Sequence, residues 1–184
     1  MLQLPPTPPT EHSKLPIPEC YWVIPGRLLA GEYPGVPFAP ERTRRRIDAF
    51  LEAGIDTFID LTGDGEIQPY APILREQAAA YDRAVAHKRF PIDDFGVPSV
   101  DGMKATLDAI DESLAQGHVI YVHCYGGIGR TGTTVGCFLV RQGRNGEEAL
   151  GQLATWWREV PKHTRFPNSP QTLSQEGFVL NWQI

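Results

Sequence analysis

The sequence predicts an α/β fold in which a central, mostly parallel sheet is flanked by helices on both faces. Short apolar runs rich in β-branched residues alternate along the chain with longer segments of helical periodicity. The length of 184 residues corresponds to one domain, which can bury enough surface to fold without disulfides or a structural metal. A composition of 41% hydrophobic and 21% charged residues excludes a disordered chain, a coiled coil and a collagen.

The N-terminal segment is rich in proline, with six of the 17 prolines of the chain in its first 18 residues. We expect an extended polyproline II arm over residues 1–18, followed by one domain over residues 19–184. The PxxP spacing of this arm also occurs in partner-binding motifs, but we favour an arm that lies along the domain or forms a loose end. The segment has neither a basic nor an apolar leader region, so we expect no signal peptide.

The first half of the domain is expected to begin with two short strands. A Pro-Gly turn separates the apolar runs 21–24 and 28–30. Residues 41–53 carry apolar side chains on one face and are followed by Gly54, which predicts a helix with a buried side. The run 55–61 is apolar and predicts a short buried strand.

The middle of the chain continues the alternation. We expect a helix over 69–82 and a strand over 84–90. Ser99 is a suitable N-cap for a helix that reaches residue 115, because its hydroxyl can accept a hydrogen bond from a free backbone N–H of the first turn. The run 118–123 is rich in β-branched and aromatic residues and predicts another strand.

Three helices are expected in the C-terminal third. The helix 130–142 is apolar on nearly all sides, so it should be buried. An Asn-Gly pair at 145–146 separates it from a helix at 147–159, and a last helix is expected from residue 170 to the end of the chain.

Charge and hydropathy argue against two kinds of partner, nucleic acid and a membrane. Seventeen basic and 22 acidic residues give a net charge of −5, which does not favour general nucleic-acid binding. No apolar run has the roughly 18 residues of a membrane span.

Arg42, Arg44, Arg45 and Arg46 form a local basic run on the first predicted helix. We expect a solvated helix face, with an anchor for acidic substrate sequence as the alternative.

Cysteine usage indicates a reduced protein. Cys20, Cys124 and Cys137 are odd in number, widely spaced and without a CxxC pair, which excludes a disulfide framework or a zinc site. Free thiols suit the cytoplasm, which is the location we expect. The histidines show no metal-ligand spacing, and we expect neither a metal nor a cofactor.

The most informative segment follows the predicted strand 118–123. Cys124 is separated from Arg130 by a five-residue loop, and Arg130 opens the apolar helix. Glycines adopt backbone angles that let successive N–H groups converge on an anion. The helix N-terminus adds positive potential, and an arginine can grip two phosphate oxygens. The loop predicted to bind phosphate consists of Tyr125, Gly126, Gly127, Ile128 and Gly129.

Cys124 is predicted to be a nucleophile. A helix N-terminus and a nearby cation both stabilise a thiolate, which is the reactive form of cysteine. An inert core thiol is the alternative for an isolated cysteine, but it does not explain the glycine-rich loop or the arginine. Cys137 is the contrasting case, because it sits in the middle of an apolar helix and is predicted to be core.

The pattern of His123, Cys124, five spacers, Arg130 and Thr131 resembles the signature of the cysteine-dependent protein tyrosine phosphatases. Within that family it looks most like the dual-specificity phosphatases of the cyclin-dependent-kinase-associated type. Further similarity lies in the segments 54–61, 65–66 and 90–94 and in a glutamine near the C-terminus. The resemblance covers about residues 20–182 and implies a compact phosphatase domain of this α/β class.

The resemblance also implies an acid in a loop upstream of the cysteine. Asp94 matches that position better than Asp93, which we expect to be a helper or a solvated charge. The loop contains Gly and Pro and precedes a helix, so it could close over the site. A pair of surface carboxylates without a catalytic role is the alternative.

Three supporting roles are implied in the same way. Thr131 would hydrogen-bond the thiolate, and His123 would orient the loop. Gln175 corresponds to a glutamine that positions the hydrolytic water in relatives, with Gln171 as its rival.

The predicted function is a protein phosphatase that forms a phosphocysteine intermediate. The uncharged loop favours phosphoproteins over phosphoinositides, with phosphotyrosine as substrate and phosphoserine or phosphothreonine in addition. We expect a monomer. The alternatives are a phosphate-recognition module without turnover, which usually lacks one of the three key residues, and another cysteine-loop enzyme. A sulfurtransferase would not need Asp94, and low-molecular-weight phosphatases and arsenate reductases place their cysteine near the N-terminus.

Overall fold

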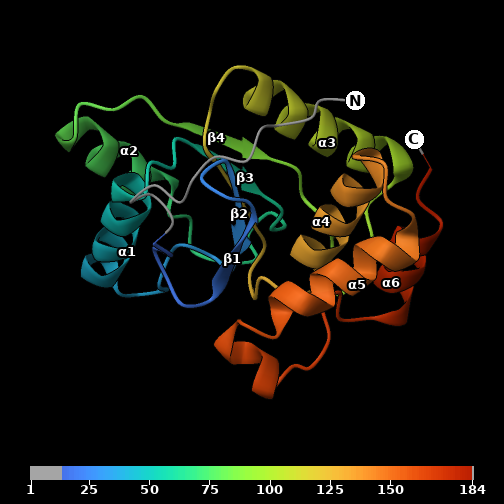
Figure 1. The fold of residues 1–184 in the computed structure, drawn as a ribbon. Coiled ribbons are helices and arrows are strands. Elements are labelled where there is room, and N and C mark those ends of the chain that lie inside the picture. Colours follow the sequence, from blue (N-terminus) through green and yellow to red (C-terminus); the bar gives the residue numbers. More distant parts are fainter. Residues whose placement is uncertain (1–13, 184) are drawn as a thin grey trace.

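A five-stranded sheet with strand order β1-β2-β5-β3-β4 forms the centre of the computed structural model, which describes residues 14–183 (Figure 1). β1 runs antiparallel to β2, and all other neighbours in the sheet are parallel. The predicted mostly parallel α/β sheet is therefore confirmed. The strands are β1 (Cys20–Ile24), β2 (Leu28–Gly31), β3 (Thr57–Asp60), β4 (Ala86–Arg89) and β5 (Ile120–His123).

Helices cover both faces of the sheet (Figure 1). α1 (Pro40–Glu52) and α2 (Ala71–Ala80) pack on one face, where Phe50 and Leu74 share a buried cluster with Phe58 and Tyr121 of the sheet. The opposite face carries the other hydrophobic cluster. The helices on that face are α3 (Val100–Ala115), α4 (Gly129–Arg141), α5 (Gly146–Trp157) and α6 (Leu173–Leu180).

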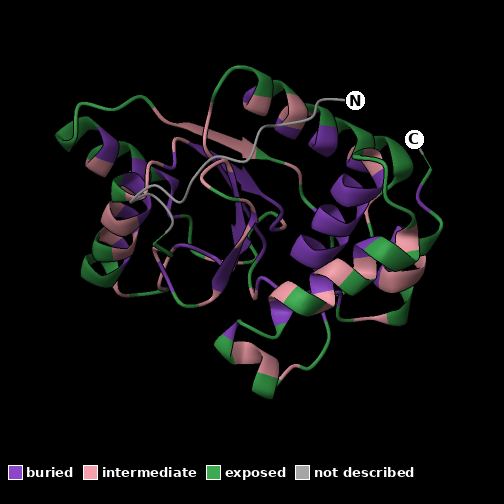
Figure 2. Ribbon diagram, viewed as in Figure 1, coloured by how far each residue is buried: buried purple, intermediate pink, exposed green. Residues whose placement is uncertain are grey.

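α4 is the most deeply buried helix of this second layer, as its sequence predicts. Every residue from Gly129 to Val140 is buried, which Figure 2 shows as a purple helix between the sheet and α5. Gly136 permits close packing, because a Cβ at this position would lie 2.7 Å from the Val179 side chain of α6. The N-terminus of α4 is thereby fixed beside the carboxyl end of β5.

Several element boundaries differ from the sequence prediction. The strand expected over 55–61 pairs only over Thr57–Asp60, and the helix expected from residue 170 begins at Leu173. Thr172 caps that helix by accepting a hydrogen bond from the backbone N–H of Gln175. A 3₁₀ helix, η2 (Pro161–Thr164), follows α5 and was not predicted. Ser99 caps α3 as expected. Residues 1–13 of the predicted arm lie outside the described residues.

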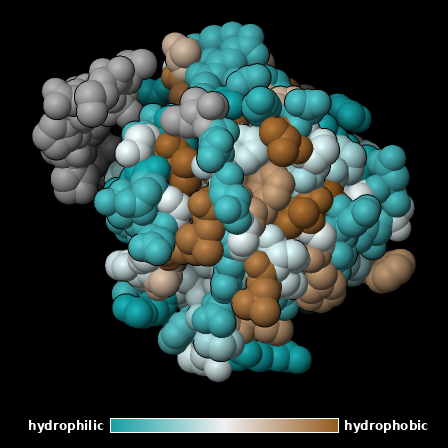
Figure 3. All heavy atoms as spheres, turned by 90° about the vertical axis from the view of Figure 1, so that its right-hand side faces the viewer, coloured by the Kyte–Doolittle hydropathy of each residue, from teal (hydrophilic) through white to brown (hydrophobic). Residues whose placement is uncertain are grey.

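The surface over the second helix layer is largely hydrophilic around its margin, with hydrophobic side chains in smaller groups toward its centre (Figure 3).

The basic run on α1 is only partly a solvated face. Arg44 pairs with Glu41 and Glu76 at the surface, whereas Arg46 pairs with Glu32 at 2.6 Å beside the end of β2. Within residues 14–183, no helix combines the length and apolar character needed to cross a membrane.

Candidate active site

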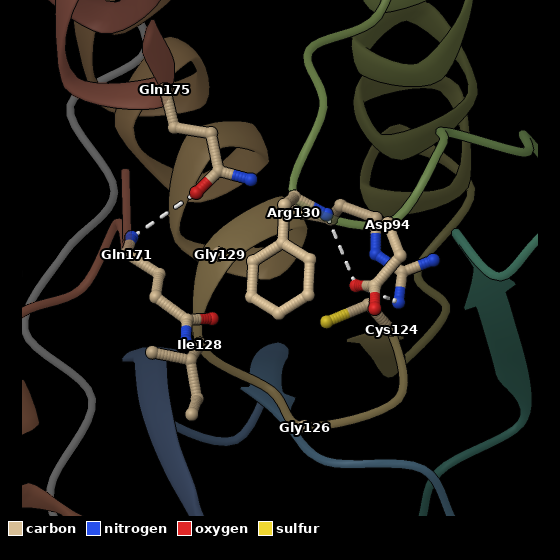
Figure 4. A pocket seen from close by; sticks show the side chains of 9 residues that line it. Asp94, Cys124, Gly126, Ile128, Gly129, Arg130, Gln171 and Gln175 are labelled. Carbon is tan, nitrogen blue, oxygen red and sulfur yellow. Dashed lines mark hydrogen bonds and ion pairs between the residues drawn. The ribbon is translucent and has the colours of Figure 1, made fainter. Parts of the chain in front are cut away.

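The candidate site lies where β5 ends and the chain passes through the loop 124–128 into α4. Gly31 of β2 and Asp60 of β3 both pair with His123, so three parallel strands end together at this edge of the sheet. A pocket opens here, and its lining brings together loops and helices distant in sequence (Figure 4). It is lined by Asp94, Phe95, Cys124, Gly126, Ile128, Gly129, Arg130, Gln171 and Gln175.

The first part of the loop 124–128 has its carbonyl groups bonded from outside the pocket. The ring nitrogen Nδ1 of His123 lies 3.2 Å from the Cys124 carbonyl oxygen, and the backbone N–H of Tyr33 donates to the Tyr125 carbonyl at 2.9 Å. In a trans peptide the carbonyl and the following N–H point in opposite directions. The N–H groups of Tyr125 and Gly126 are thereby turned away from these outer partners.

The second part of the loop is held in the same way. The Lys162 ammonium donates to the Gly126 carbonyl at 3.0 Å, and the Ser169 hydroxyl donates to the Ile128 carbonyl at 2.8 Å. The N–H groups that follow these carbonyls are directed to the inner side of the loop. Such a set of convergent N–H groups at a helix N-terminus is an anion-binding nest.

Gly127 is the tightest point of the loop. Its φ of +74° lies in the left-handed region, and a Cβ built on it would stand 2.4 Å from the carbonyl carbon of Gly31. Gly126 differs on both counts, because its φ is not positive and a Cβ there would meet only the Ile128 side chain at 3.5 Å. The loop therefore depends on glycine at 127 far more than at 126.

Arg130 is 2% exposed and is held by carboxylates. Its two terminal nitrogens each lie 2.6 Å from an oxygen of Glu66, and one of them also donates to the Ile92 carbonyl at 3.1 Å. Burial alone would lower the pKa of the guanidinium, but the hydrogen bonds with Glu66 raise it above its ordinary value. The same pair lowers the pKa of Glu66. Arg130 is therefore fixed in the charged state, and Glu66 is a site residue to which the sequence analysis assigned no role.

Asp94 faces the same arginine. One of its carboxylate oxygens lies 3.0 Å from Arg130 (Figure 4), although the Asp94 side chain is 54% exposed. Asp93 does not line the pocket; its carbonyl accepts a hydrogen bond from the Gly96 N–H in the turn that follows. Phe95 lies within this turn with a φ of +58°, which is costly for a bulky residue, and lines the pocket.

Gln175 connects the loop that carries Asp94 to α6. Its amide nitrogen donates to the Gly96 carbonyl at 3.0 Å, and its amide oxygen accepts from the N–H groups of Gln171 and Thr172. The side chain is 1% exposed, and its amide packs against Gly129 of α4. The Gln171 side chain also lines the pocket (Figure 4).

His123 and Thr131 lie under the loop and are fully buried. Burial lowers the pKa of His123 to about 4, so the imidazole is neutral near pH 7. A carbonyl oxygen can only accept, so Nδ1 donates to Cys124 and Nε2 accepts from the Tyr70 hydroxyl at 2.8 Å. The Thr131 hydroxyl donates to the Gly31 carbonyl at 3.5 Å.

The other two cysteines lie in the hydrophobic clusters, apart from the pocket. Burial raises the pKa of Cys20 to about 12 and raises that of Cys137 as well, so neither thiol is ionised near neutrality. Among residues 14–183, no group of three or more His, Cys, Asp or Glu side chains is placed to hold a metal ion.

The comparisons with known proteins place this chain in a phosphatase family. Residues 35–144 match the family model Tc-R-P, described as "Polymorphic toxin system, DSP-PTPase phosphatase". The chain belongs to this phosphatase family. The model spans Asp94, the loop 124–128 and Arg130, and the family resemblance expected from the sequence is confirmed.

Two of the curated relatives are much longer than this chain. It is 31% identical over 103 residues to mouse "Protein tyrosine phosphatase domain-containing protein 1", covering 52% of this chain and 14% of that protein. It is 26% identical over 171 residues to Caenorhabditis elegans "Tyrosine-protein phosphatase cdc-14", covering 89% of this chain and 22% of that protein. The chain thus spans less than a quarter of either relative.

Solved phosphatase structures share the fold of this phosphatase. The kinase-associated phosphatase KAP, with its catalytic cysteine replaced by serine, superposes with a TM-score of 0.67 and 18% identity over 85% of this chain and 89% of that chain. Tk-PTP in its active form gives a TM-score of 0.63 and 24% identity over 86% and 93% of the two chains. The similarity in fold includes the cyclin-dependent-kinase-associated type suggested by the loop motif.

Gly127→Ala should abolish phosphate binding and activity on p-nitrophenyl phosphate, because the added Cβ collides with the backbone of Gly31 in a left-handed conformation that alanine resists. Gly126→Ala is the matched control and should have a much smaller effect. Isothermal titration with phosphate and steady-state kinetics measure both. Equal effects of the two alanines would contradict the close approach of the loop to β2.

Proposed function

We propose that this phosphatase cleaves phosphate monoesters through a covalent phosphocysteine at Cys124. The observation that carries the proposal is the convergence of Cys124, Arg130 and Asp94 on one pocket. The thiolate attacks phosphorus, a sulfur–phosphorus bond forms, and the ester bond to the leaving oxygen breaks as Asp94 gives that oxygen a proton. Water then attacks phosphorus, Asp94 takes a proton from it, and the thiolate leaves with the release of phosphate.

The loop and Arg130 supply the electrostatic part of this proposal. Inward N–H groups of the loop and the arginine are arranged before the substrate arrives, so they stabilise charge on the phosphoryl oxygens without reorganisation. Thr131 at the start of α4 donates its hydroxyl proton to the Gly31 carbonyl in this structure, and it would turn that donor to the leaving thiolate in the second step. His123 would act as a positioning residue by holding the Cys124 carbonyl outward.

We propose phosphorylated protein as the substrate, with phosphotyrosine preferred and phosphoserine and phosphothreonine also accepted. Phe95 and Ile128 add apolar surface to a pocket that otherwise holds charged and amide groups, which suits an aromatic leaving group. The loop residues Tyr125 to Gly129 carry no charge that would meet the extra phosphates of an inositol lipid. We further propose that the chain acts as a monomer in a reducing cytoplasm, in keeping with its free thiols.

Cys124→Ser tests the covalent step. Turnover of p-nitrophenyl phosphate should fall below detection, because a serine hydroxyl is not ionised at neutral pH, while phosphate binding stays near that of the parent. Rapid quench with ³²P-labelled substrate should give labelled protein for the parent and none for Cys124→Ser. Thiosulfate is the control substrate: sulfur transfer in place of phosphate hydrolysis would indicate a sulfurtransferase. Turnover by a clean Cys124→Ser preparation, or binding without turnover by the parent, would contradict the proposal.

Asp94→Asn is expected to lower kcat by about 10²–10⁴-fold on alkyl and phenyl phosphates, the usual contribution of a positioned acid. The loss should shrink on aryl phosphates with good leaving groups, because these hardly need protonation. Asp93→Asn is the matched neighbour and should cost much less, since Asp93 does not line the pocket. A larger loss from Asp93→Asn would reverse the proposed assignment of the acid.

We propose different tasks for the two glutamines of the pocket. The amide of Gln175 is engaged at both ends, so it contributes by holding the acid loop against α6. Gln171, whose side chain lines the pocket, is then the candidate for orienting the hydrolytic water. This modifies the role that the resemblance implied for Gln175.

Rapid-quench kinetics separate these tasks. Gln171→Ala should slow the breakdown of the phosphocysteine, by about tenfold for one lost hydrogen bond to the attacking water, so that labelled enzyme accumulates. Gln175→Ala should instead slow formation of the intermediate, because the acid loop loses its tether. Accumulation of phosphoenzyme in Gln175→Ala but not in Gln171→Ala would return the water-positioning role to Gln175.

A further inference from the structure

We infer that Lys162 is a positioning residue that sets the orientation of the Gly126–Gly127 peptide from outside the phosphate-binding loop and thereby tunes its affinity for phosphate. The inference rests on the proposed function only in assuming that phosphate binds in this loop. Lys162 belongs to η2, the element that was not predicted from the sequence, and lies 36 positions from Gly126.

Lys162 is held in place on two sides. Its ammonium donates to the Gly126 carbonyl at 3.0 Å and also to the carboxylate of Glu32. The other oxygen of Glu32 accepts from Arg46 at 2.6 Å, and Arg46 donates to the Tyr33 carbonyl at 3.2 Å. η2 and α1 are thus joined through one carboxylate at the end of β2, immediately outside the loop.

The peptide that Lys162 contacts is the one with the greatest freedom to rotate. Glycines flank it on both sides, so rotation of its plane meets little resistance from side chains. One orientation directs the Gly127 N–H toward the pocket, and the opposite one would direct the Gly126 carbonyl there and repel a phosphate. A bond from a cation to that carbonyl favours the first orientation and should make the Gly127 N–H a stronger donor.

Lys162 differs from the other outer partners of the loop. His123, the backbone of Tyr33 and the hydroxyl of Ser169 are neutral donors, and the first is fully buried. The Lys162 side chain is 27% exposed and places a positive charge on the outer side of the loop. Its loss should therefore change the loop without removing a core contact.

Phosphate titration followed by ¹H–¹⁵N NMR tests the inference in the 184-residue chain carrying Cys124→Ser, with Lys162→Met as the key variant. The phosphate Kd should rise by about tenfold, which corresponds to the loss of one charge-assisted hydrogen bond. The Gly127 amide proton should move upfield with and without phosphate, while the Gly126 amide, fixed through Tyr125, should move little. Lys162→Arg should restore most of the affinity, and Lys162→Gln, a neutral donor, should be intermediate.

Arg165→Met is the matched control, since it removes one positive charge from the same segment. Arg165 is exposed and lies over the Phe166 ring at 5.3 Å, away from the loop carbonyls. Its phosphate Kd should change less than twofold. An equal loss in Arg165→Met would show that net charge alone acts, and an unmoved Gly127 amide in Lys162→Met would overturn the positioning role.

The same experiment separates the two proposals. If the Cys124→Ser parent binds no phosphate, the proposed function fails, yet the Gly127 amide shift of the free protein still tests the peptide orientation. If Lys162→Met does not fold, as judged by its thermal transition, Lys162→Gln supplies the same comparison with the hydrogen-bond donor retained. A Gly127 amide unchanged in Lys162→Gln, with unchanged phosphate affinity, would also overturn the inference.

Discussion

The outward orientation of the carbonyl groups in the loop 124–128 is the constraint on which the rest of the site depends. Isolated peptide groups of glycine-rich chain have no reason to present their N–H groups to one side. Here separate parts of the fold each take one carbonyl: the strand end at His123, the backbone after β2, η2 through Lys162, and the segment before α6 through Ser169. The sheet register brings these parts to one edge, so the anion site is a property of the whole fold.

Burial of Arg130 imposes a second requirement. Burial of a guanidinium without a counterion is costly in free energy, because the charge loses its hydration and gains no compensating interaction. Glu66 meets the cost with two hydrogen bonds of 2.6 Å, and its own carboxylate is kept in place by the Gly63 N–H at 2.8 Å. The turn after β3 therefore places the Glu66 carboxylate where it can neutralise the charge of Arg130. These contacts hold Arg130 in one position, which under the proposed function is the preorganisation that electrostatic catalysis requires.

Much of the fold and part of the site could be predicted because the relevant signals are local. Cys124, the loop glycines and Arg130 lie within seven consecutive positions, and the apolar pattern of α4 spans a single helix. The partners of these residues could not be found in this way. Glu66 lies 64 positions from Arg130, and Ser169 lies 41 positions from Ile128, so only the folded chain brings each pair together. Arg46 illustrates the same limit: its helix pattern indicated solvent, whereas its carboxylate partner comes from the end of β2.

The loop that carries Asp94 connects the two constraints described above, the orientation of the loop 124–128 and the burial of Arg130. Glu66 and Asp94 together place two negative charges on one Arg130, so a phosphate dianion could bind this arginine only if one of the two carboxylates moved away. Glu66 makes two contacts of 2.6 Å with 21% of its side chain exposed, whereas Asp94 is 54% exposed and lies 3.0 Å away. Under the proposed function, the weaker and more solvated partner is the one that phosphate would displace. Gln175 would keep the displaced loop at the pocket through its hydrogen bond to the Gly96 carbonyl. Under the proposed function, substrate binding would thus release the Asp94 carboxylate from Arg130 and leave it free to face the leaving oxygen.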